Sequence, residues 1–245
     1  MTIAFLERET GSRLAYRQRS GRGPTIIFFP GYASDMDGAK AVALDGFAEQ
    51  DGLSFLRFDY AGTGSSDGRF EEGTLASWLE DAAFIVDRLT DGPVVLVGSS
   101  MGGWISLHLA LRIPQRVAAI VGIAAAPDFT DWGFPDHLKG RLGVGETLRR
   151  EFPDGGTQVT TAGFWQSGQS MRLLDSEIAI DCPVRLIHGD LDDAVPLGIA
   201  LRLKDALRSA DVQVTVIKGG GHRLSEAHEI DTILRTVAAL LEPSE

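Results

Sequence analysis

The sequence predicts an α/β protein in which a mostly parallel, twisted sheet carries helices on both faces. Short β-branched apolar runs bounded by glycine and proline recur along the chain, and segments with helical periodicity lie between them. Such runs are typical of strands buried on both faces of a parallel sheet, and their alternation with helices places those helices on both faces. With 245 residues, of which 44% are hydrophobic and 23% charged, the chain fits one domain spanning residues 1–245.

Each element follows from a local pattern. The opening residues 3–8 and 14–19 flank Thr10-Gly11-Ser12 and predict an antiparallel hairpin at the sheet edge. Apolar residues at helical spacing predict one helix over residues 75–89, with Thr74 as its N-cap, and another over residues 230–241. The runs expected to form parallel strands are residues 25–29, 53–59, 93–97, 117–124, 184–188 and 212–217.

Residues 128–176 interrupt this alternation, because they contain no convincing buried strand. A segment of this length is too long for a simple loop, so it predicts a small cap or lid inserted into the domain. Two interpretations stay open: a small satellite core, or an apolar roof over a substrate. The second predicts that Trp132, Phe134, Phe164 and Trp165 line a substrate pocket. The aromatic residues of the segment are Phe129, Trp132, Phe134, Phe152, Phe164 and Trp165.

Composition excludes several function classes. The net charge of −11 disfavours nucleic acid as a partner, because phosphates are neutralised by clustered Lys and Arg. The longest apolar run, residues 117–126, is about half a membrane span, and the N-terminus resembles no targeting peptide. The single Cys182 excludes an intrachain disulfide and a thiolate metal site. We therefore expect a soluble cytoplasmic protein with no membrane span, no metal and no cofactor.

The pattern G-x-S-x-G occurs twice, at residues 64–68 and 98–102. A nucleophile elbow requires a sharp turn between a strand and a helix. Ser100 fits, because it follows the apolar run Val94 to Val97 and precedes helical periodicity. Ser66 is followed by a polar loop, which favours a structural turn. The neighbouring Gly62-Thr63-Gly64 has the wrong glycine spacing for a dinucleotide site.

A serine nucleophile needs a histidine base and an acid, in the chain order Ser, acid, His. His222 follows the run 212–217 and three glycines, so it lies at a strand's C-terminal end, where open α/β sheets place catalytic groups. His108, His137, His188 and His228 have ordinary structural explanations. The loop after residues 184–188 offers Asp190, Asp192 and Asp193, and spacing alone does not choose among them.

These motifs resemble the α/β-hydrolase superfamily over nearly the whole chain, which implies the α/β-hydrolase fold. The segment from His188 to Pro196 is similar to the superfamily's H-G-x-x-D-x-x-V-P, which implies Asp192 as the acid. Several segments resemble the branch that contains the mitochondrial acyl-protein thioesterase (depalmitoylase) and acyl-glucuronide esterase. They are Phe29-Pro30-Gly31-Tyr32, Ser34-Asp35-Met36, Phe58-Asp59-Tyr60, residues 64–68, residues 98–104 and His222-Arg223.

The resemblance also implies an oxyanion hole formed by the backbone N–H groups of Tyr32 and Met101. Many superfamily members have His-Gly where this chain has Pro30-Gly31, but the loop acts through a backbone N–H, so the change need not remove the donor. The branch's transit peptide is absent from this sequence, which favours a bacterial-type cytoplasmic form.

The leading hypothesis is a serine hydrolase that cleaves acyl esters or thioesters of small molecules or lipids through an acyl-enzyme on Ser100. A serine peptidase or amidase would use the same residues, and a non-catalytic ligand-binding relative could keep them. Arg141, Arg149, Arg150 and Arg172 could meet an acidic leaving group, although plain surface arginines are the commoner case. The acyl group, the leaving group and the oligomeric state stay open at this stage.

Overall fold

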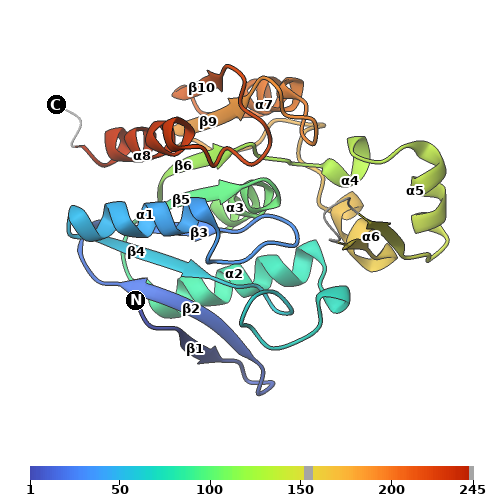
Figure 1. Ribbon diagram of the computed structural model, residues 1–245, viewed down its shortest axis with the longest axis horizontal. Helices are drawn as coiled ribbons and strands as arrows, with labels where there is room; N and C mark the ends of the chain where they lie inside the picture. Colours follow the sequence, from blue (N-terminus) through green and yellow to red (C-terminus); the bar gives the residue numbers. More distant parts are fainter. Residues whose placement is uncertain (152–156, 243–245) are drawn as a thin grey trace.

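The computed structural model describes residues 1–151 and 157–242, and within them an eight-stranded sheet forms the centre of the molecule (Figure 1). The strand order is β1-β2-β4-β3-β5-β6-β9-β10. β1 pairs antiparallel with β2 and β2 antiparallel with β4, while the remaining neighbours are parallel. The predicted α/β class and edge hairpin are confirmed. The strands are β1 Ala4–Glu7, β2 Arg13–Arg19, β3 Arg22–Phe29, β4 Leu53–Phe58, β5 Val94–Ser99, β6 Val117–Ile123, β9 Val184–Gly189 and β10 Val212–Ile217.

Helices cover both faces of this sheet. Alternate residues of β3 show the division, because Ile26 and Phe28 pack on one side with α1 (Ala39–Gln50) and α8 (Ala227–Leu241). Ile27 and Phe29 pack on the other side. The helices on that second side are α2 Leu75–Leu89, α3 Met101–Arg112 and α7 Leu197–Ala206.

The structure of α2 follows from its sequence. The Thr74 side chain accepts a hydrogen bond from the Ser77 N–H and the Ser77 side chain accepts one from the Thr74 N–H, which forms a capping box. Trp78, Leu79 and Ala82 then bury the apolar stripe against the sheet. The predicted bounds, residues 75–89, are those of the helix. A short 3-10 helix, η1 Phe70–Glu72, precedes it.

β10 differs from the expectation of a strand buried on both faces. It pairs only with β9 among the described strands, so it is an edge strand, and all its residues except the buried Ile217 are exposed or partly buried. Val216 is 46% exposed. An edge strand has one hydrogen-bonding side and less cover, which a run of β-branched residues does not reveal.

The described residues of the segment 128–176, which leave out 152–156, form three helices and a strand pair that group together at one end of the molecule (Figure 1). The elements are α4 Phe129–Trp132, α5 Asp136–Gly143, β7 Leu148–Glu151, β8 Thr157–Thr160 and α6 Ala162–Ser170. The antiparallel pair β7–β8 was not predicted, because both strands are short, β7 is mostly exposed, and neither contains an apolar run. Phe152 lies outside the described residues. The role of this segment as a cap stays a prediction, and we call it the cap segment.

No helix in the described part of the chain combines the length and the apolar character needed to cross a bilayer.

Candidate active site

Ser100 occupies the turn between β5 and α3. β5 ends at Ser99 and α3 begins at Met101, which leaves Ser100 alone to reverse the chain. Its backbone has φ 52° and ψ −118°, a region that residues with a side chain seldom adopt. The strain shows that the surrounding structure forces this geometry, and the side chain is left partly exposed at the C-terminal end of the sheet.

Glycines make the turn possible. A Cβ atom on Gly98 would overlap the carbonyl oxygen of Gly102, and a Cβ atom on Gly102 would overlap that of Phe29. Strand and helix can therefore approach closely only because both positions lack side chains. This requirement explains the glycine flanks of the second G-x-S-x-G pattern.

His222 reaches Ser100 from the loop between β10 and α8. Its Nε2 lies 3.2 Å from Ser100 Oγ, and its Nδ1 lies 2.9 Å from Asp192 Oδ2. A carboxylate can only accept a hydrogen bond, so the Nδ1 carries the proton and the Nε2 lone pair faces the serine hydroxyl. This is the protonation state in which an imidazole can accept the serine proton.

Asp192 is fully buried at its side chain and follows β9. Its Oδ1 accepts hydrogen bonds from the N–H groups of Ala194 at 2.9 Å and Val195 at 2.8 Å. Burial acts to raise the pKa of Asp192, but the hydrogen bonds from His222, Val195 and Ala194 outweigh it and hold the pKa below the ordinary value. The carboxyl therefore stays ionised opposite His222.

The other two loop carboxylates point elsewhere. Asp190 accepts a hydrogen bond from the Gly219 N–H, and both Asp190 and Asp193 are exposed. The acid and histidine loops are joined by a hydrogen bond from the Leu191 N–H to the Gly220 carbonyl, 3.0 Å long.

His188 contacts the loop that carries Asp192. It is buried, its Nε2 lies 2.8 Å from the Val195 carbonyl oxygen, and the same nitrogen lies 3.4 Å from Asp192 Oδ2. The ring thus fixes the turn that presents Asp192.

The loop after β3 lies against the elbow. A Cβ atom on Gly31 would be 3.4 Å from Ser100 Cβ, so the backbone preceding Tyr32 passes directly beside the serine. Among the described residues, the N–H groups of Tyr32 and Met101 donate to no acceptor. The Met101 N–H also opens α3, and the N-terminal end of a helix favours a developing negative charge.

The Tyr32 side chain lies in an aromatic cluster shared with the cap segment. Its ring lies 4.6 Å from that of Phe164 and 5.8 Å from that of Trp78, measured between centroids. Its hydroxyl donates to the Val159 carbonyl of β8. Burial raises the pKa of Tyr32 above its ordinary value, so the hydroxyl remains a donor.

The four aromatic residues predicted to line a substrate pocket differ in their burial and in their contacts. Phe164 is only 1% exposed and packs in the aromatic cluster, while Phe134 is partly buried. The indole N–H groups of Trp132 and Trp165 donate to the carbonyls of Pro127 and Thr130, each at 2.8 Å. Their contact with a substrate stays a prediction.

A cavity of about 340 Å³ opens between the loop after β3, the loop after β4 and β8. None of those four aromatic residues is part of its lining, which is Ala33, Ser34, Asp35, Gly62, Thr63, Gly64, Phe70, Thr157 and Val159. This cavity was not predicted, because its walls come from segments that are far apart in the sequence and are brought together by the fold.

The remaining predicted candidates lie outside the site. Ser66 Oγ donates to the Asp59 carbonyl and accepts from the Ala15 N–H, each at 2.8 Å, so this hydroxyl holds a turn. His108 contacts the Met171 carbonyl, and burial lowers its pKa. His137 and His228 are exposed. In the part of the chain that the structure describes, no group of three or more His, Cys, Asp or Glu side chains could hold a metal ion.

Known proteins resemble this chain along almost its whole length. A family model described as the alpha/beta hydrolase fold matches residues 24–152. Human "Palmitoyl-protein thioesterase ABHD10, mitochondrial" is 39% identical, over 98% of this chain and 80% of its own length. The structure of mouse alpha/beta hydrolase domain-containing protein 10 superimposes with a TM-score of 0.91 at 38% identity, covering 98% of each chain. A protein of Agrobacterium vitis S4 does so with a TM-score of 0.91 at 32% identity, over 99% of this chain and 100% of that chain.

The prediction of a cytoplasmic location is wrong by this comparison. The human, orangutan and bovine relatives are all named as mitochondrial proteins. A cellular address is recognised by transport receptors, so the charge and composition of a folded domain do not determine it.

The resemblance seen in the sequence motifs is confirmed by these relatives. Because the family model covers more than half of the residues and the relatives align along nearly all of them, the chain belongs to the α/β hydrolase fold family.

Proposed function

We propose that this protein is a serine hydrolase that cleaves acyl thioesters or esters, with Ser100 as nucleophile, His222 as base and Asp192 as the acid that orients it. The observation that supports the proposal is the continuous hydrogen-bonded series from Asp192 through His222 to Ser100. The names of the relatives, palmitoyl-protein thioesterases, favour a lipid acyl group.

In the first half of the reaction, Ser100 Oγ attacks the acyl carbon while its proton moves to His222 Nε2. Asp192 holds the imidazole in the required tautomer and stabilises the imidazolium. The negative charge on the carbonyl oxygen is stabilised by the N–H groups of Tyr32 and Met101. The carbon–sulfur or carbon–oxygen bond then breaks, and the leaving group takes the proton from His222.

In the second half, water attacks the acyl group on Ser100. His222 accepts a proton from the water and returns one to Ser100 Oγ, which releases the carboxylic acid. In both halves of the reaction, each proton is accepted and donated by His222.

The test compares wild type, Ser100→Ala and Ser66→Ala on octanoyl and palmitoyl thioesters, p-nitrophenyl octanoate and peptide anilides. We expect Ser100→Ala to lose on the order of 10⁴-fold or more of kcat, because nucleophile and base act as a unit. Ser66→Ala, the matched control from the other G-x-S-x-G pattern, stays within a few-fold of wild type.

A wild-type protein that cleaves the anilides in preference to the thioesters would make it a peptidase or amidase. A protein that binds acyl compounds without turnover, and does not react with a fluorophosphonate, would be a non-catalytic binder. Either result would overturn the proposal.

A further inference from the structure

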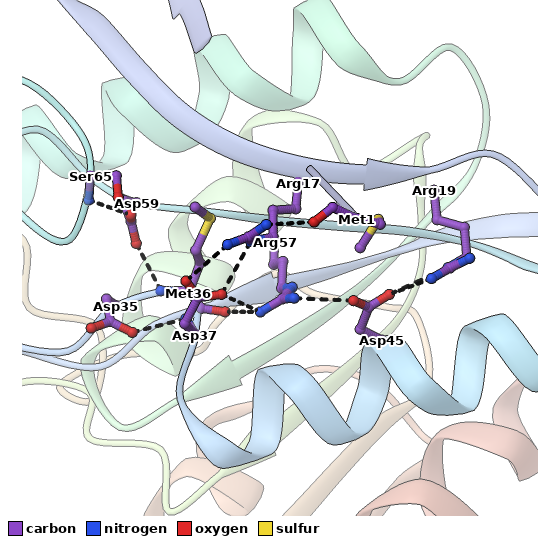
Figure 2. A network of polar contacts seen from close by, with 10 residues as sticks. All are labelled: Met1, Arg17, Arg19, Asp35, Met36, Asp37, Asp45, Arg57, Asp59 and Ser65. Atoms are coloured by element: carbon purple, nitrogen blue, oxygen red, sulfur yellow. Dashed lines mark hydrogen bonds and ion pairs between the residues drawn. The ribbon is translucent and has the colours of Figure 1, made fainter. Parts of the chain in front are cut away.

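Two charged side chains at the end of β4 hold the backbone of one residue, Met36, in the loop that follows β3. Arg57 lies near the end of β4 and Asp59 directly after it, so both project from the same face of the sheet. The Asp59 carboxylate accepts a hydrogen bond from the Met36 N–H at 2.7 Å, and the Arg57 guanidinium donates to the Met36 carbonyl at 2.7 Å (Figure 2). Both polar groups of Met36 are therefore held from β4.

Arg57 is fixed in turn by two carboxylates. Its Nη1 lies 2.7 Å from Asp37 Oδ1, and its Nη2 lies 3.1 Å from Asp45 Oδ2 on α1. Arg17 and Arg19 of β2 also bind Asp37 and Asp45, as Figure 2 shows. The Arg57–Asp45 pair is buried, whereas Asp37 is half exposed. A buried ion pair contributes little net stability, so its main effect here is to fix the direction of the Arg57 guanidinium.

Asp59 is seated by the first G-x-S-x-G pattern, the one that supplies no nucleophile. Its Oδ2 accepts a hydrogen bond from the Ser65 N–H at 2.8 Å. Ser66 Oγ donates to the main-chain carbonyl of Asp59 and not to its carboxylate, so Ser66→Ala leaves both partners of the carboxylate in place. A Cβ atom on Gly64 would overlap the carboxylate. Asp59 is only 1% exposed, so the pattern at residues 64–68 encloses it.

The loop held in this way carries Tyr32. Between the end of β3 and Met36 the chain forms a turn in which the Ser34 N–H donates to the Gly31 carbonyl, and Ala33 has φ 55°. A left-handed conformation costs a residue with a side chain about 1 kcal/mol or more, so the turn needs restraint from outside. β3 supplies that restraint at one end and the Arg57–Asp59 pair supplies it at the other.

We propose that Asp59, assisted by Arg57, is a positioning residue for the oxyanion hole. By holding the N–H and the carbonyl of Met36, the two side chains set the direction of the Tyr32 N–H beside Ser100. The inference rests on the proposed function, because the Tyr32 N–H matters only if an oxyanion forms there.

The test is Asp59→Asn. The Met36 and Ser65 N–H groups donate to different oxygens of the carboxylate, and an amide places an NH2 donor at one of those two positions. We expect kcat to fall by about 10- to 100-fold, below the loss of about 10²–10³ for a whole oxyanion donor, with KM nearly unchanged. The affinity for an octyl trifluoromethyl ketone, which forms a tetrahedral adduct with Ser100, falls by the same factor. The affinity for octanoic acid, the product, does not change. Fluorophosphonate labelling counts the reactive sites in each sample.

The matched control is Asp81→Asn. Asp81 is also buried, accepts a hydrogen bond from the Ala61 N–H at 2.8 Å and forms an ion pair with Arg8. It lies on α2 and does not contact Met36. We expect a lower Tm with kcat and ketone affinity near wild type. If Asp59→Asn does not fold, Arg57→Lys replaces it in the test. Lysine keeps the positive charge but lacks the second guanidinium nitrogen, so we expect kcat and ketone affinity to fall together, by less than in Asp59→Asn.

A folded Asp59→Asn enzyme with wild-type kcat and wild-type ketone affinity would overturn the inference and leave the proposed function standing. Equal losses of kcat in Asp59→Asn and Asp81→Asn would also overturn it, because they would mark a general effect of stability. A wild-type protein that neither hydrolyses octanoyl esters nor binds the ketone would remove the proposed function, and the inference with it.

Discussion

The strained backbone of Ser100 is held by close packing and by hydrogen bonds, since its N–H donates to the Ile123 carbonyl at 2.9 Å and its carbonyl accepts from the Ala126 N–H at 3.1 Å. The Gly102 position tests this account. Gly102→Ala places a methyl group against the Phe29 carbonyl, so we expect a loss of about 3 kcal/mol or more in unfolding free energy and loss of activity.

Gly46→Ala on α1 is the control for that substitution. A Cβ atom there meets nothing within 4 Å, and a helix interior favours Ala over Gly by about 0.5–1 kcal/mol. Urea unfolding of both variants measures the difference. A Gly102→Ala protein as stable as Gly46→Ala would contradict the packing described at the elbow.

Asp192, the proposed acid, gives a second prediction at this scale. Because the pKa of Asp192 is lower in the folded protein than its ordinary value, the ionised group stabilises the fold above the unfolded-state pKa of about 3.9. That contribution is lost as the pH falls through the folded-state pKa. We therefore expect the difference in unfolding free energy between wild type and Asp192→Asn to shrink as the pH falls below about 4.

Urea unfolding over a pH series measures that difference. At neutral pH the folded Asp192→Asn protein should also lose about 10⁴-fold of kcat, since the amide favours the wrong histidine tautomer. Asp193→Asn, which changes an exposed neighbour, is the control. A difference in unfolding free energy that is constant or grows below pH 4 would contradict the pKa direction.

Ser100 and His222 could be proposed from the sequence, because each follows a recognisable strand in a distinctive glycine context, and the fold brings the two side chains within 3.2 Å. Asp192 could not be chosen from spacing. Its distinction from Asp190 and Asp193 arises from the turn after β9, in which two backbone N–H groups and His222 meet one carboxylate. That meeting is a tertiary contact and leaves no local signal.

At the scale of elements, the periodic helices were predictable and the edges were not. The bounds of α2 follow from its capping box and apolar stripe. The exposure of β10 depends on its having one neighbour, and the pair β7–β8 has no apolar run. The Tyr32 contact with Phe164 joins the loop after β3 to α6, which only the folded chain reveals.

The cap segment carries the prediction about substrates. If an apolar acyl chain is buried beside it, each methylene contributes up to about 0.8 kcal/mol, roughly fourfold in kcat/KM. We expect kcat/KM to rise from acetyl to medium-chain esters and thioesters, and then to level off. Trp132→Ala or Trp165→Ala flattens this rise more than it changes acetyl-ester turnover.

A series of p-nitrophenyl esters measures the profile, with His137→Ala, an exposed change on α5, as the control. A preference for acetyl over octanoyl esters, or a profile that ignores both tryptophans, would leave the cap segment as a satellite core.

At the scale of the whole molecule, the parallel sheet brings the site together. Ser100 follows β5, Asp192 follows β9 and His222 follows β10, and the C-terminal ends of parallel strands meet at one edge of a sheet. The sequence predicts this gathering once the strands are recognised. The contacts of Arg57 and Asp59 with the loop that carries Tyr32 depend on charged residues from β2, β4 and α1. No single segment of the sequence contains all of these residues, so the sequence does not predict their contacts.

The central claim is that an acyl group is carried on Ser100, and intact-protein mass spectrometry during turnover tests it most directly. Wild type mixed with excess p-nitrophenyl octanoate and quenched in acid should gain the mass of one octanoyl group, and peptide mapping should place it on Ser100. The Ser100→Ala protein should gain none, while Ser66→Ala should behave as wild type. Octanoyl found on another residue of an active enzyme, or rapid turnover by Ser100→Ala, would contradict the account.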